Sequence, residues 1–326
     1  MKAERRTPAA LVAAVFEEEP PQGRILFAGE DAADAQARSG FEGTVWLRDA
    51  GSAIDPLMWP PSQDYAAATL RMARAHDAYV MALHALAARL PEGAPIYIYG
   101  PNDEGIRSAP RDFAKLFADH ETALTRGHSR LWRARRTASS DGLRATLADW
   151  RRVQPLEFAG AKRDWVSYPG VFAQGLLDPA TALLIGVLPQ NGTGAALDFG
   201  AGGGVLARVL MERGFAVDMI ERDVLALEAA RENVPQARAI CGDRLFDSGR
   251  YGLIVSNPPI HVGRAVDLRV VESLMAGAPK LLTRGGSLML VTQQTVPLPR
   301  LAEGHFKSVE QMAEFKGFRV WRLRNP

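Results

Sequence analysis

A short proline-rich turn carries the groups best suited to hold an amino group. Asn257, Pro258 and Pro259 follow an apolar stretch that is expected to form a strand. Consecutive prolines remove their backbone donors and stiffen the turn, so that the Asn257 side-chain oxygen and the Pro258 carbonyl become fixed acceptors. When both accept from one amine, its lone pair is aimed at an electrophile and its developing positive charge is stabilised. The turn therefore predicts methyl transfer to an exocyclic amine, with no metal ion and no covalent intermediate.

A glycine-rich segment lies upstream of this turn. Asp198 precedes Gly200, Gly202 and Gly204, which open a predicted helix. Glycines let the backbone approach a ligand closely and leave the amides at the helix N-terminus free, and both features suit a nucleotide-like cofactor. A dinucleotide pyrophosphate would fit such a loop as well. The glycines alone therefore leave an NAD-dependent dehydrogenase open, although nothing in the chain supplies a hydride-transfer acid and base.

Acidic residues at successive strand ends narrow the choice of cofactor. Glu221 follows the second strand of this half, about 20 residues after the glycine loop, where a carboxylate accepts from ribose hydroxyls. Asp243 follows the third strand and is placed to accept from an adenine amino group. Asp198 would lie beside the amino-acid portion of the cofactor. These positions together predict S-adenosylmethionine as cofactor, with S-adenosylhomocysteine as its product.

The C-terminal half must bring these residues to one edge of a sheet. Strands are expected at 195–199, 216–220, 237–241, 251–256 and 287–292, and helices at 205–213, 224–233 and 266–282. Segments 306–312 and 318–322 are expected to form a closing antiparallel pair. The pattern predicts an α/β, doubly wound, Rossmann-like sheet, in which ligands bind at the carboxyl ends of the strands.

The N-terminal half repeats this pattern less regularly. Strands are expected at 24–29, 44–47, 95–99 and 131–136, and helices at 63–90 and 109–119. The segment 27–31 lacks the glycines of a cofactor loop, so this copy is expected to be degenerate. A linker is expected at 154–168, where prolines and glycines interrupt the periodicity. We therefore expect two tandem domains, 1–155 and 156–326.

The composition suits a two-domain protein without a metal site. The 326 residues match two domains of about 150 residues each. No apolar run approaches the ~20 residues of a membrane-spanning helix, and no signal-peptide cleavage pattern is evident, so a cytoplasmic protein is expected. The single cysteine, Cys241, excludes an internal disulfide and a multi-thiolate zinc site, and the six histidines are dispersed. No metal is predicted.

Arginines are concentrated in one stretch of the chain. The net charge of +2 is too small to indicate RNA binding by itself, but eight arginines lie between positions 126 and 152 against two aspartates. Trp132 and Trp150 are interleaved with them, and such a strip suits contact with phosphates. Arg133, Arg135 and Arg136 are the candidate substrate contacts. A solvated strand face with an interdomain connection explains the strip equally well.

These motifs together resemble a known enzyme family. The glycine loop followed by Asn-Pro-Pro is similar to that of class I methyltransferases that act on amino nitrogens. The chain further resembles the RsmC-like ribosomal RNA guanine-N2 methyltransferases at 169–172, 175–178, 257–263, 296–299 and 318–322, and in the first half at 25–29, 59–60 and 105–109. The resemblance covers essentially the whole chain.

The resemblance implies two copies of the methyltransferase fold, of which only the C-terminal copy binds cofactor while the other helps to hold RNA. It implies that Phe172 closes over the methionine end of S-adenosylmethionine, and that a guanine is flipped from its stack to reach the methyl group. The family usually has an aromatic residue after the prolines, where this chain has Ile260, so part of the ~1–3 kcal/mol of base stacking is lost. Ile260 would pack against the base, and His261, which matches the family, would support the turn or contact the base.

Several functions remain open from the residues. The favoured one is methylation of a guanine N2 in 16S ribosomal RNA, free or in the 30S subunit, by a monomer, with 23S RNA as a further target. A protein-glutamine N5 methyltransferase is an alternative, because that side-chain amide presents the same paired N–H groups to Asn257. A non-catalytic RNA-binding factor in ribosome assembly is another, and only Ile260 supports it. The arginine strip favours an RNA substrate.

Overall fold

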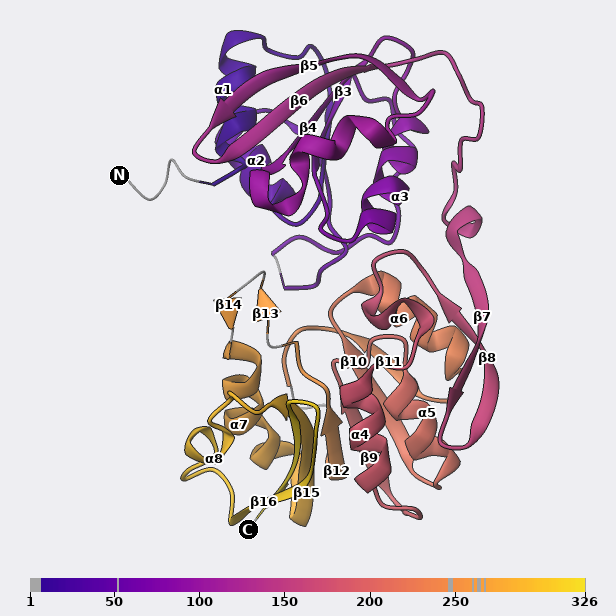
Figure 1. Ribbon diagram of the computed structural model, residues 1–326, viewed down its shortest axis with the longest axis vertical. Coiled ribbons are helices and arrows are strands. Elements are labelled where there is room, and N and C mark those ends of the chain that lie inside the picture. The colour runs from indigo at the N-terminus through magenta and orange to yellow at the C-terminus, as the bar shows by residue number, and fades with distance from the viewer. Residues whose placement is uncertain are drawn as a thin grey trace. The chain divides into compact units, whose positions relative to one another are not determined.

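The chain forms two structural units, Met1–Arg151 and Arg152–Pro326, each described here by itself (Figure 1). The structure, a computed structural model, describes residues 7–51, 53–245, 249–259, 261–262, 265–266 and 268–325, and only the backbone of 261–262 and 265–266. The sequence placed the division after residue 155, whereas residue 152 already begins a strand of the second unit. No helix in the described ranges is long and apolar enough to span a membrane.

The second unit contains the predicted doubly wound sheet. Its strands are β9 (Ala195–Phe199), β10 (Ala216–Glu221), β11 (Arg238–Cys241), β12 (Tyr251–Ser256), β15 (Leu282–Gln293), β16 (Ser308–Phe315) and β17 (Phe318–Arg324). They lie in the order β11-β10-β9-β12-β15-β17-β16. The first five in this order are parallel, and β17 pairs antiparallel with both β15 and β16. The expected closing hairpin is confirmed.

Helices cover both faces of this sheet. They are α4 (Pro179–Val187), α5 (Val205–Glu212), α6 (Val224–Asn233), α7 (Arg269–Leu281) and the short α8 (Leu298–Leu301). Successive residues of β12 lie on opposite faces of the sheet. Val255 packs in one core with α4 and α5, and Ile254 packs in the other core with α7 and α8. Because both faces are buried, the central strands β9 and β12 are mostly apolar, although β9 carries Asp198 near its end.

The first unit has a smaller sheet with the same plan. Its elements are α1 (Ala10–Glu18), β1 (Ile25–Ala28), α2 (Ala32–Ser39), β2 (Gly43–Trp46), β3 (Ala67–Arg71), α3 (His76–Ala87), β4 (Pro95–Pro101), η2 (Asn102–Glu104), η3 (Ile106–Asp112), β5 (Phe117–Arg126), β6 (Ser129–Arg136) and η4 (Leu147–Trp150). The order β2-β1-β3-β4-β6-β5 matches β10-β9-β12-β15-β17-β16 in position and direction. Only a counterpart of β11 is missing among the described strands. One architecture is therefore used twice.

Two predictions for the first unit were wrong. The segment 63–90 is not one helix, because β3 occupies Ala67–Arg71 and only α3 is helical. All five residues of β3 are buried, so the strand lacks the alternation that would distinguish it from an alanine-rich helix. The segment 109–119 was also predicted as a helix, but it contains the end of η3, with Pro110 inside it, and the start of β5.

The expected linker at 154–168 is instead a β-hairpin. β7 (Arg152–Phe158) pairs antiparallel with β8 (Ala161–Ser167). Ala159 and Gly160, which join them, both have positive φ, +50° and +74°, as in the two-residue turns that suit twisted hairpins. Leu156, Phe158 and Trp165 are buried in the core of the second unit. Pro155 and Gly160 therefore interrupt a strand pair and do not mark a domain boundary.

Candidate active site

The predicted site residues of the second unit lie at the carboxyl edge of its parallel strands. Asp198 is near the end of β9, and Glu221 is the last residue of the adjacent β10. Ser256, the last residue of β12, lies beside Phe199, and its hydroxyl donates to the Phe199 carbonyl at 2.7 Å. Asn257, the next residue, therefore lies close to the start of the glycine loop, as expected for a site at the carboxyl edge of a parallel sheet.

The glycine loop lies between β9 and α5 and needs its glycines for conformation. Gly200, Gly202 and Gly204 have φ of +72°, +54° and +90°, values that side-chain-bearing residues rarely adopt. Several amides of the loop, before the helix begins, already have partners. The amides of Gly200 and Ala201 donate to the Ile220 carbonyl, and that of Gly202 donates to Glu221 Oε2 at 2.8 Å. A ligand can therefore approach the backbone of this loop closely, but several of the loop amides are not available to donate to it.

Asp198 is fully buried and only half satisfied. Its Oδ2 accepts from the Ala207 amide of α5 at 2.9 Å. Within the described residues, Oδ1 is buried and has no hydrogen-bond partner. Burial, with the nearby Glu221 carboxylate, raises the pKa of Asp198 to about 7, against the lowering effect of the Ala207 amide. A buried oxygen without a partner is costly, so it marks a place for a donor from outside the protein.

Glu221 is fixed by the backbone around it. It accepts from the amides of Gly202, Arg222 and Asp223 at 2.8, 2.7 and 2.9 Å. Burial raises its pKa, although these amides act in the opposite direction. Asp243 is more exposed and has Arg244 at 3.6 Å. Gly242, just before Asp243, donates to the Glu221 carbonyl, so the ends of β10 and β11 lie together.

The Asn257 side chain is tied to the N-terminus of α4. Its Nδ2 donates to Asp178 Oδ2 and to Thr181 Oγ1, both at 2.9 Å. Asp178 caps α4, accepting from the Thr181 amide at 2.8 Å. Among the described residues, no donor is bonded to Asn257 Oδ1. Both N–H bonds of the amide are therefore used, and its oxygen is left as an acceptor.

The rest of the proline turn is only partly described. Pro258 is buried and Pro259 is exposed. Ile260 lies outside the described residues. His261 is in the short strand β13 (His261–Val262), paired with β14 (Ala265–Val266), but its side chain also lies outside what is described. The roles expected for Ile260 and His261 remain predictions.

The segment before α4 carries Phe172. It lies in η5 (Phe172–Gly175), and 62% of its surface is exposed. A side chain built at Gly202 would lie 3.9 Å from Phe172 Cβ, so this segment approaches the glycine loop. Ala173, Gln174 and Gly175 all have positive φ. This run of left-handed residues is backbone strain beside the candidate site.

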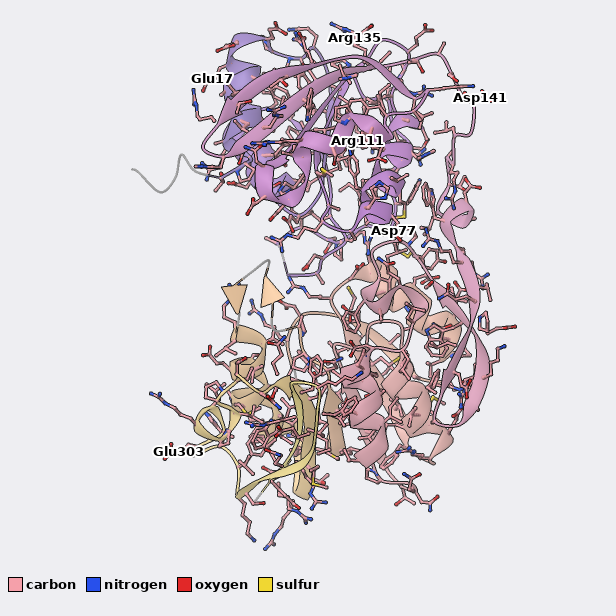
Figure 2. All side chains as sticks on the ribbon, in the orientation of Figure 1. Glu17, Asp77, Arg111, Arg135, Asp141 and Glu303 are labelled. Carbon is pink, nitrogen blue, oxygen red and sulfur yellow. The ribbon has the colours of Figure 1, made fainter. Side chains whose placement is uncertain are left out.

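The candidate arginines lie on β6 of the first unit and differ in availability. Arg135 is exposed and donates to the Gly93 carbonyl at 3.1 Å (Figure 2). Arg133 is ion-paired with Glu19 and Glu121. Arg136 is only 7% exposed and donates to four backbone carbonyls, at Ala87, Leu116, Thr137 and Ser139. This geometry gives Arg136 a structural role in place of the RNA contact expected from the sequence.

Sequence reasoning missed three residues that hold the site together. Asp178 and Thr181 orient Asn257, and the Asp178-Pro179 pair at the start of an apolar helix was a readable N-cap signal. Asn233, at the end of α6, bonds to both the amide and the carbonyl of Val166 in β8, and to the Gly203 carbonyl at 3.0 Å. No local pattern distinguishes Asn233 from an ordinary residue at a helix end.

In the first unit, an arginine occupies the position of Asn257. Ser256 lies beside Phe199 at the end of β9, and Leu70 lies beside Ala28 at the end of β1. The next residues are Asn257 and Arg71. The Arg71 side chain is 4% exposed and ion-paired with Glu30 and Glu104. A side chain built at Gly29 would lie only 2.6 Å from Arg71 Cβ. Arg71 therefore packs directly against the counterpart of the glycine loop in this unit.

Comparison with known proteins identifies the family. Residues 162–322 match the methyltransferase small domain family. The chain is 33% identical to the ribosomal RNA small subunit methyltransferase C of Ectopseudomonas mendocina, over 93% of this chain and 95% of that protein. The chain belongs to the ribosomal RNA small subunit methyltransferase C family. It is also 35% identical to the protein of that name from Chromohalobacter salexigens, over 74% of this chain and 72% of the relative.

A solved structure extends the likeness to both units. It is the T. thermophilus 16S rRNA N2 G1207 methyltransferase (RsmC) in complex with AdoMet and guanosine, with a TM-score of 0.79 and 22% identity. The alignment covers 97% of this chain and 92% of that one. The two-copy fold expected from the sequence is thereby confirmed, together with the resemblance to this family.

The methyl donor of the family, S-adenosylmethionine, fits the residues present. The unpartnered Oδ1 of Asp198 suits an ammonium group such as that of the donor's amino-acid portion. Glu221 and Asp243 place carboxylates at neighbouring strand ends, where the ribose and the adenine are expected from the sequence. A dinucleotide fits less well, because loop amides that would bind its pyrophosphate already donate within the protein. No cluster of metal-ligand side chains occurs in the described part of the chain.

Proposed function

We propose that this chain transfers a methyl group from S-adenosylmethionine to the N2 amino group of a guanine in 16S ribosomal RNA. The observation that carries the proposal is the acceptor oxygen of Asn257, because both N–H bonds of its amide are directed away to α4. An acceptor fixed in this way beside a cofactor loop suits a substrate that donates, such as an amine. The relatives' names support ribosomal RNA as the carrier of that amine.

The protein's part in the reaction is to orient the amine and to stabilise its charge. When bound, S-adenosylmethionine supplies a methyl group on a positively charged sulfur. Asn257 Oδ1 accepts one N–H bond of the guanine amine and the Pro258 carbonyl accepts the other, which aims the nitrogen lone pair at the methyl group. The same oxygens stabilise the positive charge that develops on N2 as the new bond forms, until its proton is lost.

The first unit is proposed to hold the RNA. Its cofactor position is closed by Arg71, so it is free of a catalytic task. Arg135 is the best placed of the candidate arginines, because it is exposed, and Arg133 would have to exchange its glutamate partners for phosphate. The substrate is proposed to be 16S RNA, either free or in the small subunit. The protein is proposed to act as a single copy, and the target guanine of the RNA to be flipped out of its stack.

The decisive experiment is transfer of labelled methyl from S-adenosylmethionine to 30S subunits, 50S subunits and free 16S and 23S RNA. We expect N2-methylguanosine in digests of 16S RNA. Asn257→Ala should reduce kcat by about 100-fold or more, because the amine loses its orientation. Asn191→Ala, at an exposed asparagine of the same unit, is the matched control and should retain full activity.

Other outcomes would overturn the proposal in recognisable ways. Label in 23S RNA alone would replace the small subunit by the large one. Transfer to a protein glutamine and to no RNA would favour the protein methyltransferase. Failure to bind S-adenosylhomocysteine would leave a non-catalytic RNA-binding protein.

A further inference from the structure

We propose that Asp178, together with Thr181, is a positioning residue for methyl transfer. The two side chains fix the rotation of the Asn257 amide so that its oxygen, and never its NH2 group, faces the substrate amine. The inference rests on the proposed function, because that function assigns Asn257 to the amine. It adds two residues at the start of α4 that act through Asn257.

The problem they solve is intrinsic to asparagine. The side-chain amide has an oxygen acceptor and an NH2 donor of nearly the same size, and rotation by half a turn exchanges them. If the Asn257 amide were reversed, its NH2 group would face the N–H groups of the amine, and no hydrogen bond could form between two donors. Orientation of the nucleophile would then be lost, although the backbone of the turn would be unchanged.

The partners of Nδ2 permit only one orientation. Asp178 Oδ2, at 2.9 Å, is a carboxylate oxygen and can only accept. The Thr181 hydroxyl donates to this carboxylate at 3.3 Å, so it meets Nδ2 at 2.9 Å with a lone pair. A reversed amide would bring its oxygen against a carboxylate and a lone pair, and would lose two hydrogen bonds, one of them charge-assisted.

The two partners are themselves held in place independently of Asn257. Asp178 Oδ2 accepts from the Thr181 amide in the first turn of α4, which is the usual N-cap bond. Pro179 follows it in the first position of the helix. Thr181 is 7% exposed, so its rotamer is fixed by packing. The helix end therefore acts as a rigid template for a turn 79 residues away in sequence.

Because Asp178 also caps α4, the test must separate capping from positioning. Asp178→Ser keeps a good N-cap residue, but the shorter side chain cannot reach Asn257. Asp178→Asn keeps an oxygen that can accept both bonds. Thr181→Val keeps the volume of Thr181 and removes its hydroxyl. Asp164→Ser and Thr193→Val, at exposed positions of the same unit, are the matched controls.

We expect a specific loss of kcat. With the RNA that the wild-type protein methylates, Asp178→Ser should lower kcat by about 10- to 100-fold, since small misplacements of a reacting group have effects of this size. Thr181→Val should lower kcat less. The KM for RNA and the Kd for S-adenosylhomocysteine should stay within about twofold, and Asp178→Asn should restore most of the rate. Because Asp178 acts through Asn257, Asp178→Ser should cause no further loss in the Asn257→Ala background.

Three results would overturn the inference while wild type is active: full kcat in Asp178→Ser, a loss in that variant that adds fully to Asn257→Ala, or an Asp178→Asn protein no faster than Asp178→Ser. An inactive wild type on every RNA would instead overturn the proposed function and the inference with it. The two failures are therefore distinguishable.

Discussion

At the residue scale, the protonation state of Asp198 is expected to influence cofactor binding. Its pKa is raised to about 7 by burial and by Glu221, so the carboxyl group is largely neutral in mildly acidic solution. The raised value means that the folded protein binds a proton more tightly than the unfolded chain. Between about pH 4 and 7, this group therefore lowers the free energy of unfolding as the pH rises. An ammonium group paired with Oδ1 would remove that cost.

Cofactor affinity should consequently depend on pH through Asp198. Only the ionised carboxylate pairs with an ammonium, so the affinity for S-adenosylhomocysteine should fall by about tenfold for each pH unit below 7 and level off above it. Titration calorimetry between about pH 5.5 and 7.5 measures this. Asp198→Asn should bind more weakly, with little pH dependence. A wild-type affinity that is constant over this range would contradict the assignment of Asp198 to the ammonium group.

A site residue could be predicted from the sequence when the pattern that marks it lies in the residues next to it. Asp198, Glu221 and Asn257 each lie at or just after the end of a strand in a regular pattern, so their common edge could be inferred without coordinates. Asp178 was missed as a partner of Asn257 because the contact spans 79 residues, and a sequence shows no pairing at that range. Arg136 was assigned to RNA because composition shows charge, whereas burial depends on the packing of β6.

At the scale of single elements, the glycine loop should be intolerant of side chains. Gly204 has φ +90°, and a Cβ there would lie 3.0 Å from Val234 and 3.4 Å from Ala230 of the α6 region. Gly204→Ala should lower the free energy of unfolding by at least about 1–2 kcal/mol from the backbone conformation alone. It should also weaken binding of S-adenosylhomocysteine. Urea unfolding and calorimetry measure the two effects.

Gly186, inside α4, is the matched control for Gly204. A Cβ there would meet nothing within 4 Å, and its backbone is helical. Gly186→Ala should therefore stabilise the protein by about 0.5–1 kcal/mol, because alanine favours the helix. Equal effects of the two substitutions would show that the loop's conformation is not what requires glycine.

Elements were predicted well where the spacing of apolar residues in the sequence reflects which residues are buried. In the second unit, α5, α6 and α7 alternate with short apolar strands and were placed close to their observed bounds, whereas α4 and α8 were not predicted. β3 was lost inside a helical prediction because its run of alanines is buried on both faces. The β7–β8 hairpin was predicted to be a linker because proline and glycine, here Pro155 and Gly160, occur both in loops and within hairpins.

At the scale of the whole molecule, the two units have opposite chemistry at one topological position. Asn257 leaves an acceptor free at the end of β12, whereas Arg71 at the end of β3 is surrounded by Glu30, Asp31 and Glu104. Burial raises the pKa of Asp31 to about 6 even beside this guanidinium. Arg71 is buried, Asp31 and Glu104 are largely buried, and Glu30 is mostly exposed.

Removal of Arg71 should destabilise the first unit without creating a cofactor site. Arg71→Met leaves the largely buried carboxyl groups of Asp31 and Glu104 without their cation and should cost about 3–5 kcal/mol. Arg74→Met is the matched control, because Arg74 pairs with the same Glu104 but is 45% exposed, and it should cost less than about 1 kcal/mol. Hydrogen exchange of peptides from β1, β3 and β4 measures the difference.

Calorimetry should give one S-adenosylhomocysteine per chain for wild type and for Arg71→Met. A second binding site in either protein would contradict the closure of the first unit.

The position of Arg71 also makes the divergence of the two copies hard to reverse. Restoring catalysis to the first unit would require an acceptor in place of Arg71 and, counting from the strand end, glycines in place of Asp31 and Ala33. Replacement of Arg71 alone would leave Asp31 and Glu104 without their cation, so we expect that intermediate to fold less stably than its parent. Selection for a stable protein is then sufficient to preserve one active and one inactive copy. The asymmetry would persist even if the first unit were never used to bind RNA.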